Sequence, residues 1–373
     1  MADKKKILIR IGSLRHGGAE KTLVTFLKNI SSDKYEIDLL LNLYSGKYLN
    51  DVPKWINIYY LNKGEMITTN RIQDIPQKAF RVIYQEVLKK YPKLLYKYIL
   101  YNKEYDIEFA AIQGIGEDVL NSPIKNSKKI LWVHSDLSNV PEFTNSKIKS
   151  FFKFDHILVI SDKINQFFLD LASSDDEKNK IVRIINPIDT TEILELSKEK
   201  IDMVKDNSIK TFISVGTNLE HKGYDRLVKI HKNLLNKGLI HKILIVGECS
   251  DKMKQLINQY KVEKSFILLG YQKNPYPFFE LADYYVLSSR IEGYPTVVFE
   301  ALLLNKFVLA TDVSGVRDMI VNGDNGIVVN NTDVDLENAM EYLIKSDIKK
   351  ADNSSKNLYS LKDSVTTIEN LLN

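Results

Sequence analysis

The sequence predicts an α/β protein with two Rossmann-like domains, each built on a parallel β-sheet. Short apolar runs rich in β-branched residues alternate with helical patterns along all 373 residues, and this alternation is typical of parallel strands joined by crossover helices. Several runs, such as Ile243–Val246, are continuously apolar, as strands are when helices cover both faces of their sheet. The length is sufficient for two domains with separate cores.

The predicted strands form two series. Those of the first series are Lys6–Gly12, Tyr35–Asn42, Ile56–Leu61, Tyr105–Ile112, Lys129–His134, Asp155–Ile160 and Ile181–Asn186. Those of the second series are Lys210–Gly216, His241–Gly247, Ser265–Gly270, Asp283–Ser288, Lys306–Thr311 and Gly326–Val329.

A charged, strand-free stretch separates the two series and follows Asn186-Pro187, a dipeptide that ends regular structure. We therefore expect an N-terminal domain over residues 1–188, a linker over 189–208 and a C-terminal domain over 209–350. A C-terminal helix over 351–373 is expected to pack back on the first domain. Ligands of such sheets bind at the carboxyl ends of the strands, so the site is expected in a cleft between the two domains.

The composition is that of an ordinary globular protein, with 44% hydrophobic and 27% charged residues. A net charge of +4 argues against a dedicated nucleic-acid-binding protein. The single cysteine, Cys249, cannot form an intrachain disulfide. No apolar run reaches the roughly 18 residues of a membrane span, and a cytoplasmic protein is expected.

The first candidate motif is the glycine pair Gly17-Gly18, which follows the first strand and precedes a helix. Glycines at such a junction let the backbone approach a ligand, and a helix N-terminus offers free N–H groups to an anion. The spacing is not that of a dinucleotide-binding fingerprint. A turn that merely requires glycine is an equally good interpretation of these residues alone.

The second motif, Val215-Gly216-Thr217 with Lys222-Gly223, ends the first strand of the second domain. A lysine at this position can place its ammonium over a phosphate. A solvated lysine at a turn is the alternative.

The third motif joins Glu292-Gly293 to Glu300 through a turn in which Pro295 suits the first turn of a helix. Glu300 lies among apolar residues of that helix, where a charge is costly unless it is paired or bound to a ligand. Both carboxylates are expected near the carboxyl edge of the sheet. An internal salt bridge is the alternative role for Glu300.

Taken in order, these residues resemble the family-four retaining glycosyltransferases of GT-B fold, which use nucleotide-sugar donors in glycan and polysaccharide biosynthesis. The resemblance covers nearly the whole chain. The matching residues are Gly17-Gly18-Ala19-Glu20, Asn186-Pro187-Ile188-Asp189, Val215-Gly216, Lys222-Gly223, Glu292 with Glu300, Ala282-Asp283, Ala310-Thr311-Asp312 with Gly315, and Gly323-Asp324-Asn325-Gly326.

The resemblance implies roles in the second domain. Lys222 would neutralise the diphosphate as it leaves, Glu292 would contact the sugar hydroxyls and Glu300 would hold the nucleotide ribose. Other donor contacts would come from Thr217, from Gly270 and Tyr271 at the base, and from the backbone amides of Gly293, Tyr294 and Thr296.

In the first domain, the resemblance implies that Gly17 and Gly18 let their loop approach the donor. His134, at the end of a predicted strand, would contact the sugar or the reaction centre, with Glu292 and Lys222 as the other catalytic candidates. A histidine at a strand end is, on its own, more often structural.

One position departs from the family pattern. Thr217 stands where the family commonly has an arginine that shares the diphosphate with the lysine. Either Lys222 works with backbone amides, or Arg15 or Arg290 supplies the second cation.

Metal binding is not expected. The histidines show no metal-ligand spacing, and the acidic Asp333-Val334-Asp335 follows Asn331-Thr332 at a predicted helix start, where carboxylates favour the helix dipole. The resemblance likewise implies transfer without a metal or other cofactor.

The segment Arg71–Lys103 carries eight basic and two acidic residues interleaved with tyrosines and leucines. Such a segment is a candidate for peripheral contact with an anionic membrane, at the inner face of the cell membrane. A solvated helix with its apolar stripe in the core is the alternative.

The expected function is therefore transfer of a hexose-type sugar from a nucleoside diphosphate, UDP by preference, to a hydroxyl of a glycan or lipid-linked glycan. Two alternatives stay open. The chain could be a sugar-nucleotide epimerase or hydrolase of the same fold, or a non-catalytic protein that binds a nucleotide sugar.

Overall fold

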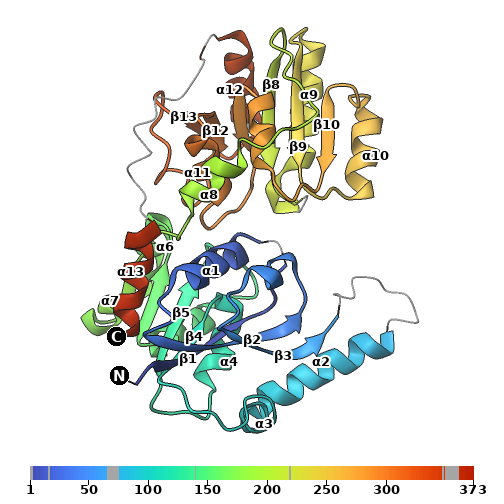
Figure 1. Cartoon of the computed structure of the whole chain (residues 1–373). Helices are drawn as coiled ribbons and strands as arrows, with labels where there is room; N and C mark the ends of the chain where they lie inside the picture. Colours follow the sequence, from blue (N-terminus) through green and yellow to red (C-terminus); the bar gives the residue numbers. More distant parts are fainter. Residues whose placement is uncertain are drawn as a thin grey trace. The chain divides into compact units, whose positions relative to one another are not determined.

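The computed structural model describes residues 3–15, 17–64, 75–138, 140–217, 220–346, 348 and 361–373. The chain forms two compact units (Figure 1). Unit 1 contains the residues up to Ile160, Ile164–Ile188 and the C-terminal helix, and unit 2 contains Ser161–Lys163 and the residues from Asp189 onward up to that helix.

Unit 1 is built on a seven-stranded sheet in the order β3-β2-β1-β4-β5-β6-β7, and all of its pairings are parallel. The strands are β1 (Lys5–Ile11), β2 (Tyr35–Tyr44), β3 (Asn57–Lys63), β4 (Ile107–Ala110), β5 (Lys128–Val133), β6 (His156–Val159) and β7 (Ile181–Arg183). The helices are α1 (Gly18–Asn29), α2 (Ile75–Lys90), α3 (Pro92–Tyr98), α4 (Gly116–Leu120), α5 (Asn145–Ser150), α6 (Asp162–Leu171), α7 (Asp175–Asn179) and α13 (Leu361–Leu372).

Unit 2 is built on a six-stranded sheet in the order β10-β9-β8-β11-β12-β13, again with parallel pairings. Its strands are β8 (Lys210–Val215), β9 (His241–Val246), β10 (Phe266–Gly270), β11 (Tyr284–Leu287), β12 (Phe307–Thr311) and β13 (Gly326–Val329). Its helices are α8 (Thr190–Leu196), α9 (Tyr224–Asn236), α10 (Asp251–Tyr260), α11 (Thr296–Leu303) and α12 (Asp333–Lys345).

Each predicted strand is present in the structure within a few residues of its expected bounds. The apolar run Ile243–Val246 shows why the pattern was informative: it forms most of β9, and its side chains are at most 3% exposed. Helices α9, α10 and α12 contribute apolar residues to the same core cluster as β9. Burial on both faces of the sheet requires apolar residues at successive positions.

The domain boundaries differ from expectation in one place. The stretch 189–208, expected to be a linker, contains helix α8 and belongs to unit 2. Asp189 begins that helix, since its side chain accepts a hydrogen bond from the Glu192 amide at 2.9 Å. Helix α8 therefore begins shortly after the Asn186-Pro187 breaker.

The C-terminal helix α13 packs on unit 1, beside the start of the chain. Lys5 Nζ donates to the Leu372 carbonyl at 3.2 Å, and Lys128 Nζ donates to the Leu371 carbonyl at 3.0 Å. The part of the expected helix before residue 361 lies outside the described residues. In the described part of the chain, no helix has the length and apolar character needed to cross a bilayer.

The strand order gives each sheet one point where the crossovers change direction. In unit 2 this point lies between β8 and β11, because β9 and β10 follow on one side while β12 and β13 follow on the other. In unit 1 it lies between β1 and β4. Loops at the carboxyl ends of such strand pairs form the ligand-binding crevices of open α/β sheets.

Candidate functional site

In unit 2, the structure brings Lys222 and Glu292 together at this change of direction. Lys222 follows β8 and ends a short 3-10 helix over Glu220–Lys222, and Glu292 follows β11. Lys222 Nζ lies 2.7 Å from Glu292 Oε1, and Ser289 Oγ donates to the same oxygen at 2.6 Å. The two side chains are 20% and 11% exposed, so both remain accessible to a ligand.

The two loops are also joined through their backbones. Ser288 Oγ donates to the Lys222 carbonyl at 2.8 Å, and the Arg290 amide donates to the His221 carbonyl at 2.6 Å. Gly223 has a φ of +70°, and a Cβ there would overlap the Ser288 carbonyl oxygen. Only glycine fits this position, because both the backbone conformation and the close approach exclude a side chain.

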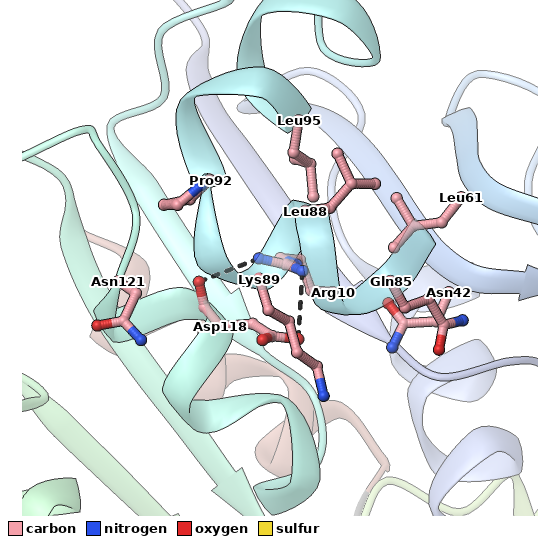
Figure 2. Close-up of a pocket in the computed structure, with 10 residues that line it drawn as sticks. All are labelled: Arg10, Asn42, Leu61, Gln85, Leu88, Lys89, Pro92, Leu95, Asp118 and Asn121. Atoms are coloured by element: carbon pink, nitrogen blue, oxygen red, sulfur yellow. Dashed lines mark hydrogen bonds and ion pairs between the residues drawn. The ribbon is translucent and has the colours of Figure 1, made fainter. Parts of the chain in front are cut away.

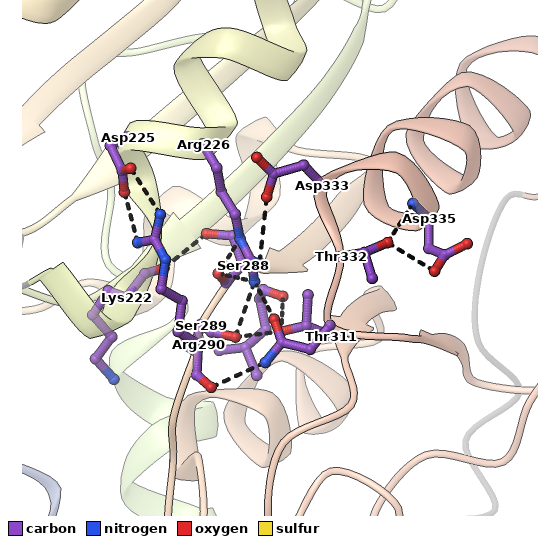
Figure 3. A network of polar contacts seen from close by, with 12 residues as sticks. Lys222, Asp225, Arg226, Ser288, Ser289, Arg290, Thr311, Thr332, Asp333 and Asp335 are labelled. Atoms are coloured by element: carbon purple, nitrogen blue, oxygen red, sulfur yellow. Dashed lines mark hydrogen bonds and ion pairs between the residues drawn. The ribbon is translucent and has the colours of Figure 1, made fainter. Parts of the chain in front are cut away.

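The sequence analysis missed Arg226, which fixes the carboxyl end of β11 (Figure 3). Its side chain is 3% exposed and donates to the Ser288 carbonyl from Nε at 2.9 Å and from Nη2 at 2.6 Å. Nη2 also reaches the Ser289 carbonyl at 3.0 Å and Asn331 Oδ1 at 2.8 Å. The sequence contains a signal for this role, since Arg226 lies in the first turn of the helix that follows Gly223 and can reach the neighbouring strand end.

Arg290 is engaged within unit 2 by Asp225. Its Nη1 and Nη2 each lie 2.8 Å from one oxygen of the Asp225 carboxylate, and Nη1 also donates to the Glu220 carbonyl at 2.7 Å. This bidentate pair holds the pKa of Asp225 below its ordinary value. Of the two cations considered as substitutes for the arginine that Thr217 replaces, Arg290 is therefore committed to bracing the loops.

Helix α11 begins directly after the Glu292 loop. Pro295 is its N-cap residue, and the proline side chain makes no capping hydrogen bond. Tyr294 is 6% exposed and packs against Gly315, where a Cβ would lie 2.8 Å from the tyrosine ring. The N-terminus of α11, which follows the Glu292 loop, and the Lys222 ammonium give this end of unit 2 a positive character that suits a diphosphate.

Glu300 lies one to two turns into α11 and is 3% exposed. Tyr276 Oη lies 3.4 Å from Glu300 Oε1.

The other donor-binding candidates of unit 2 lie at strand ends on the same edge of the sheet. Thr217 follows β8 and Gly216. Gly270 ends β10 with a φ of +71°, and its carbonyl accepts from the Gly247 amide at 2.8 Å. Tyr271 comes next and is 42% exposed, which leaves its ring accessible.

In unit 1, Gly17 and Gly18 lie where β1 gives way to α1. Gly17 is the N-cap residue of α1 and Gly18 its first residue. A Cβ on Gly17 would overlap the Glu20 carboxylate, so the glycine lets that side chain fold back over the helix start.

His134 follows β5 and is buried against the Trp132 ring, at 4.6 Å between centroids. Its amide donates to Gln113 Oε1 at 3.0 Å. Burial lowers the pKa of His134 to about 3, although a hydrogen bond with the Ala111 backbone acts in the opposite direction. The ring is therefore neutral at pH 7, and its buried Nε2 has no hydrogen-bond partner in the described part of the chain.

Unit 1 also contains a pocket that no sequence motif predicted (Figure 2). It lies among β1, β2, β3, α2, α3 and α4, and polar groups including Arg10, Asn42 and Asn121 line it. Arg10 donates from Nη1 to the Asp118 carbonyl at 3.1 Å. The polar lining of this pocket could bind hydroxyl groups, but none of the predicted donor-binding residues belongs to the pocket.

The acidic pair near residue 333 has structural partners. Thr332 Oγ1 caps α12 by accepting from the Asp335 amide at 3.1 Å, and Asp333 lies 3.6 Å from Arg226 Nη1. Across the described ranges of the chain, no group of three or more histidine, cysteine or acidic side chains is arranged to hold a metal ion.

Comparison with known proteins agrees with this geometry. Residues 197–360 match the family model of the glycosyl transferases group 1. The chain is 30% identical over 301 residues to an uncharacterized glycosyltransferase of Methanocaldococcus jannaschii, covering 74% of this chain and 71% of that protein.

A second relative, from Campylobacter jejuni, is the N-acetylgalactosamine-N,N'-diacetylbacillosaminyl-diphospho-undecaprenol 4-alpha-N-acetylgalactosaminyltransferase, 26% identical over 90% of this chain and 88% of its own. Among solved structures, Anabaena HepE in complex with UDP and glucose has a TM-score of 0.71 at 16% identity over 99% of both chains. Staphylococcus aureus TarM in complex with UDP has the same TM-score at 15% identity over 99% of this chain and all of its own. The chain belongs to the group 1 glycosyltransferases and has the GT-B fold.

Proposed function

We propose that this glycosyltransferase moves a hexose-type sugar from UDP to a hydroxyl group of a glycan or lipid-linked glycan, with retention of the anomeric configuration and without a metal ion. The observation that carries the proposal is the Lys222–Glu292 pair at 2.7 Å. The pair lies in the loops that follow the neighbouring strands β8 and β11, and α11 begins just after Glu292. This arrangement provides a cation, a carboxylate and a helix N-terminus at one place.

Each group has a distinct task in the proposed reaction. The Lys222 ammonium and the first amides of α11 stabilise the negative charge that develops on the departing diphosphate. In the proposed reaction these groups take the place of a divalent cation, so the proposal requires no metal. Glu292 binds the sugar hydroxyls, and Glu300, 3% exposed on α11, holds the ribose.

The nucleobase is assigned to the end of β10, where Gly270 and the exposed Tyr271 offer backbone and ring surface. UDP is the preferred nucleotide because the HepE and TarM structures contain it. Thr217 and the amides of Gly293, Tyr294 and Thr296 complete the proposed donor site.

Unit 1 is assigned to the acceptor and to the sugar end of the donor. The Nε2 atom of neutral His134 accepts a hydrogen bond from a sugar hydroxyl, because the ring has no other partner there in the described residues. Gly17 and Gly18 keep the start of α1 free of bulk. A lipid-linked acceptor is supported by the Campylobacter relative, whose name gives a diphospho-undecaprenol substrate. With such an acceptor the enzyme would act at the cytoplasmic face of a membrane.

Calorimetric titration with UDP tests the donor site. Lys222→Ala and Glu300→Ala should each weaken UDP binding at least tenfold, since a charge-assisted hydrogen bond contributes about 1.5–3 kcal/mol. Lys252→Ala, an exposed lysine on α10 of the same unit, is the matched control and should bind UDP normally. Unchanged UDP affinity in both site variants would refute the site assignment.

Turnover assays separate the proposal from its alternatives. A thermal-shift screen of nucleotide sugars identifies the donor, because a ligand that binds only the folded state raises its melting temperature. Sugar release without an acceptor would indicate a hydrolase, and binding with no turnover against a panel of glycan acceptors would indicate a non-catalytic protein. The product anomer, determined by NMR, tests retention, and activity in EDTA tests metal independence.

A further inference from the structure

Helix α2 of unit 1 presents an apolar face to solvent. Of its 16 residues only Leu88 is buried. Phe80, Ile83 and Val87 recur at the i, i+3, i+7 spacing that places residues on one side of a helix, and they are 65%, 62% and 40% exposed. The helix therefore has two apolar sides, of which the side with Leu88 packs on unit 1.

The outward face of α2 extends beyond these three residues. Tyr91 follows Val87 by one further turn and is 52% exposed. Figure 1 shows α2 running along the outside of unit 1. Exposed apolar residues are ordinary when scattered, but a continuous row of them on one helix indicates a surface that binds something.

The charge around this face is almost entirely positive. Between Ile75 and Lys103 the chain carries seven basic residues and a single acidic one, Glu86. Glu86 is paired with Lys89 at 3.3 Å. Five of the lysines are exposed: Lys78, Lys89, Lys90, Lys93 and Lys97.

Two of these lysines lie over exposed aromatic rings. Lys90 Nζ is 5.7 Å from the centre of the Tyr91 ring, and Lys97 Nζ is 5.2 Å from that of Tyr98. Lysines with aromatic and aliphatic neighbours on an exposed helix are characteristic of helices that lie in the interface of an anionic membrane.

We propose that α2 binds the surface of an anionic lipid bilayer, with Phe80, Ile83 and Val87 inserted below the headgroups and the lysines on the lipid phosphates. A second copy of the chain would fit less well, because two copies joined through this face would bring their lysines together. The inference rests on the proposed function in one respect, since a bilayer-bound α2 brings the enzyme to a lipid-linked acceptor.

Vesicle co-sedimentation of the full chain tests the proposal. The wild-type chain should bind phosphatidylcholine vesicles containing 30% phosphatidylglycerol and should bind pure phosphatidylcholine vesicles at least tenfold more weakly. The double variant F80S/I83S should lose at least tenfold in binding to the anionic vesicles. Ile240→Ser, at a 71% exposed position of unit 2, removes a comparable side chain and should bind as the wild type does.

The charge contribution is measured separately. The variant K90Q/K93Q/K97Q should also bind anionic vesicles more weakly, and its binding should depend less on salt. The proposal would be overturned if the wild-type chain bound anionic and pure phosphatidylcholine vesicles equally well. It would also be overturned if F80S/I83S bound the anionic vesicles as strongly as the wild type does. Light scattering that shows a lipid-free dimer, lost in F80S/I83S, would overturn it in favour of a second copy.

These results are independent of the transferase assignment. Far-UV circular dichroism should show F80S/I83S folded, because both side chains are mostly exposed. UDP titration of the same variant should give the wild-type affinity. Normal UDP binding with lost vesicle binding supports the membrane surface, whereas lost UDP binding in Lys222→Ala concerns only the donor site.

Discussion

Gly223 offers a direct test of how the donor site is held together. It lies between Lys222 and α9 with a φ of +70°, and its Cα faces the Ser288 carbonyl oxygen. Gly238, after the end of α9, has a similar φ of +80°, but a Cβ there would meet nothing within 4 Å. The pair Gly223→Ala and Gly238→Ala thus separates the cost of the backbone conformation from the cost of the close contact.

The structure gives the expected size of each effect. A left-handed conformation costs an alanine about 1–2 kcal/mol, and this is the whole cost expected for Gly238→Ala. In Gly223→Ala the added methyl group also displaces the Ser288 carbonyl, which accepts two hydrogen bonds from Arg226. Losing a hydrogen bond to a charged group adds about 1.5–3 kcal/mol, so together with the backbone cost a loss of about 2.5–5 kcal/mol of unfolding free energy is expected.

Urea unfolding followed by far-UV circular dichroism measures the difference. Tryptophan fluorescence is unsuitable, because Trp55 and Trp132 are the only tryptophans in the sequence and both belong to unit 1. UDP affinity provides a second readout: Gly223→Ala should weaken it at least tenfold as Lys222 moves, and Gly238→Ala should leave it unchanged. Equal losses of stability in the two variants would refute the idea that this contact fixes the loops.

Three further predictions concern other side chains of unit 2. Glu292→Gln should abolish sugar transfer yet tighten UDP binding about two- to fivefold, because Lys222 loses the carboxylate that competes with the diphosphate; weaker UDP binding would contradict this. Arg290→Met should raise the pKa of Asp225 and lower the transfer activity of the enzyme. Asp225→Asn should lower the activity to a similar extent if the ion pair holds the two loops together. Burial lowers the pKa of His231 to about 3. Below about pH 6.5 the imidazole therefore binds a proton in the unfolded chain but not in the folded chain, and the unfolding free energy decreases as the pH is lowered. Between pH 7.5 and 5 this histidine should account for about 2 kcal/mol of lost unfolding free energy, and urea titrations of His231→Gln should show a pH dependence flatter by that amount.

The sequence by itself determined the strands, the order of the motifs and the family, because these depend on local apolar runs and on spacing along the chain. The Ile243–Val246 run could form only a buried strand in this context, and the carboxyl ends of parallel strands carry the loops with Lys222 and Glu292.

Only the tertiary structure decided which groups meet. Lys222 and Glu292 are 70 residues apart, and their contact depends on β8 and β11 being neighbours in the sheet. Arg226 and Arg290 look alike in the sequence, yet one is buried on backbone carbonyls and the other is paired with Asp225. Helix α2 has apolar residues on two sides, and because periodicity records that a side is apolar but not what covers it, the exposure of Phe80 and Ile83 became visible only in the folded chain.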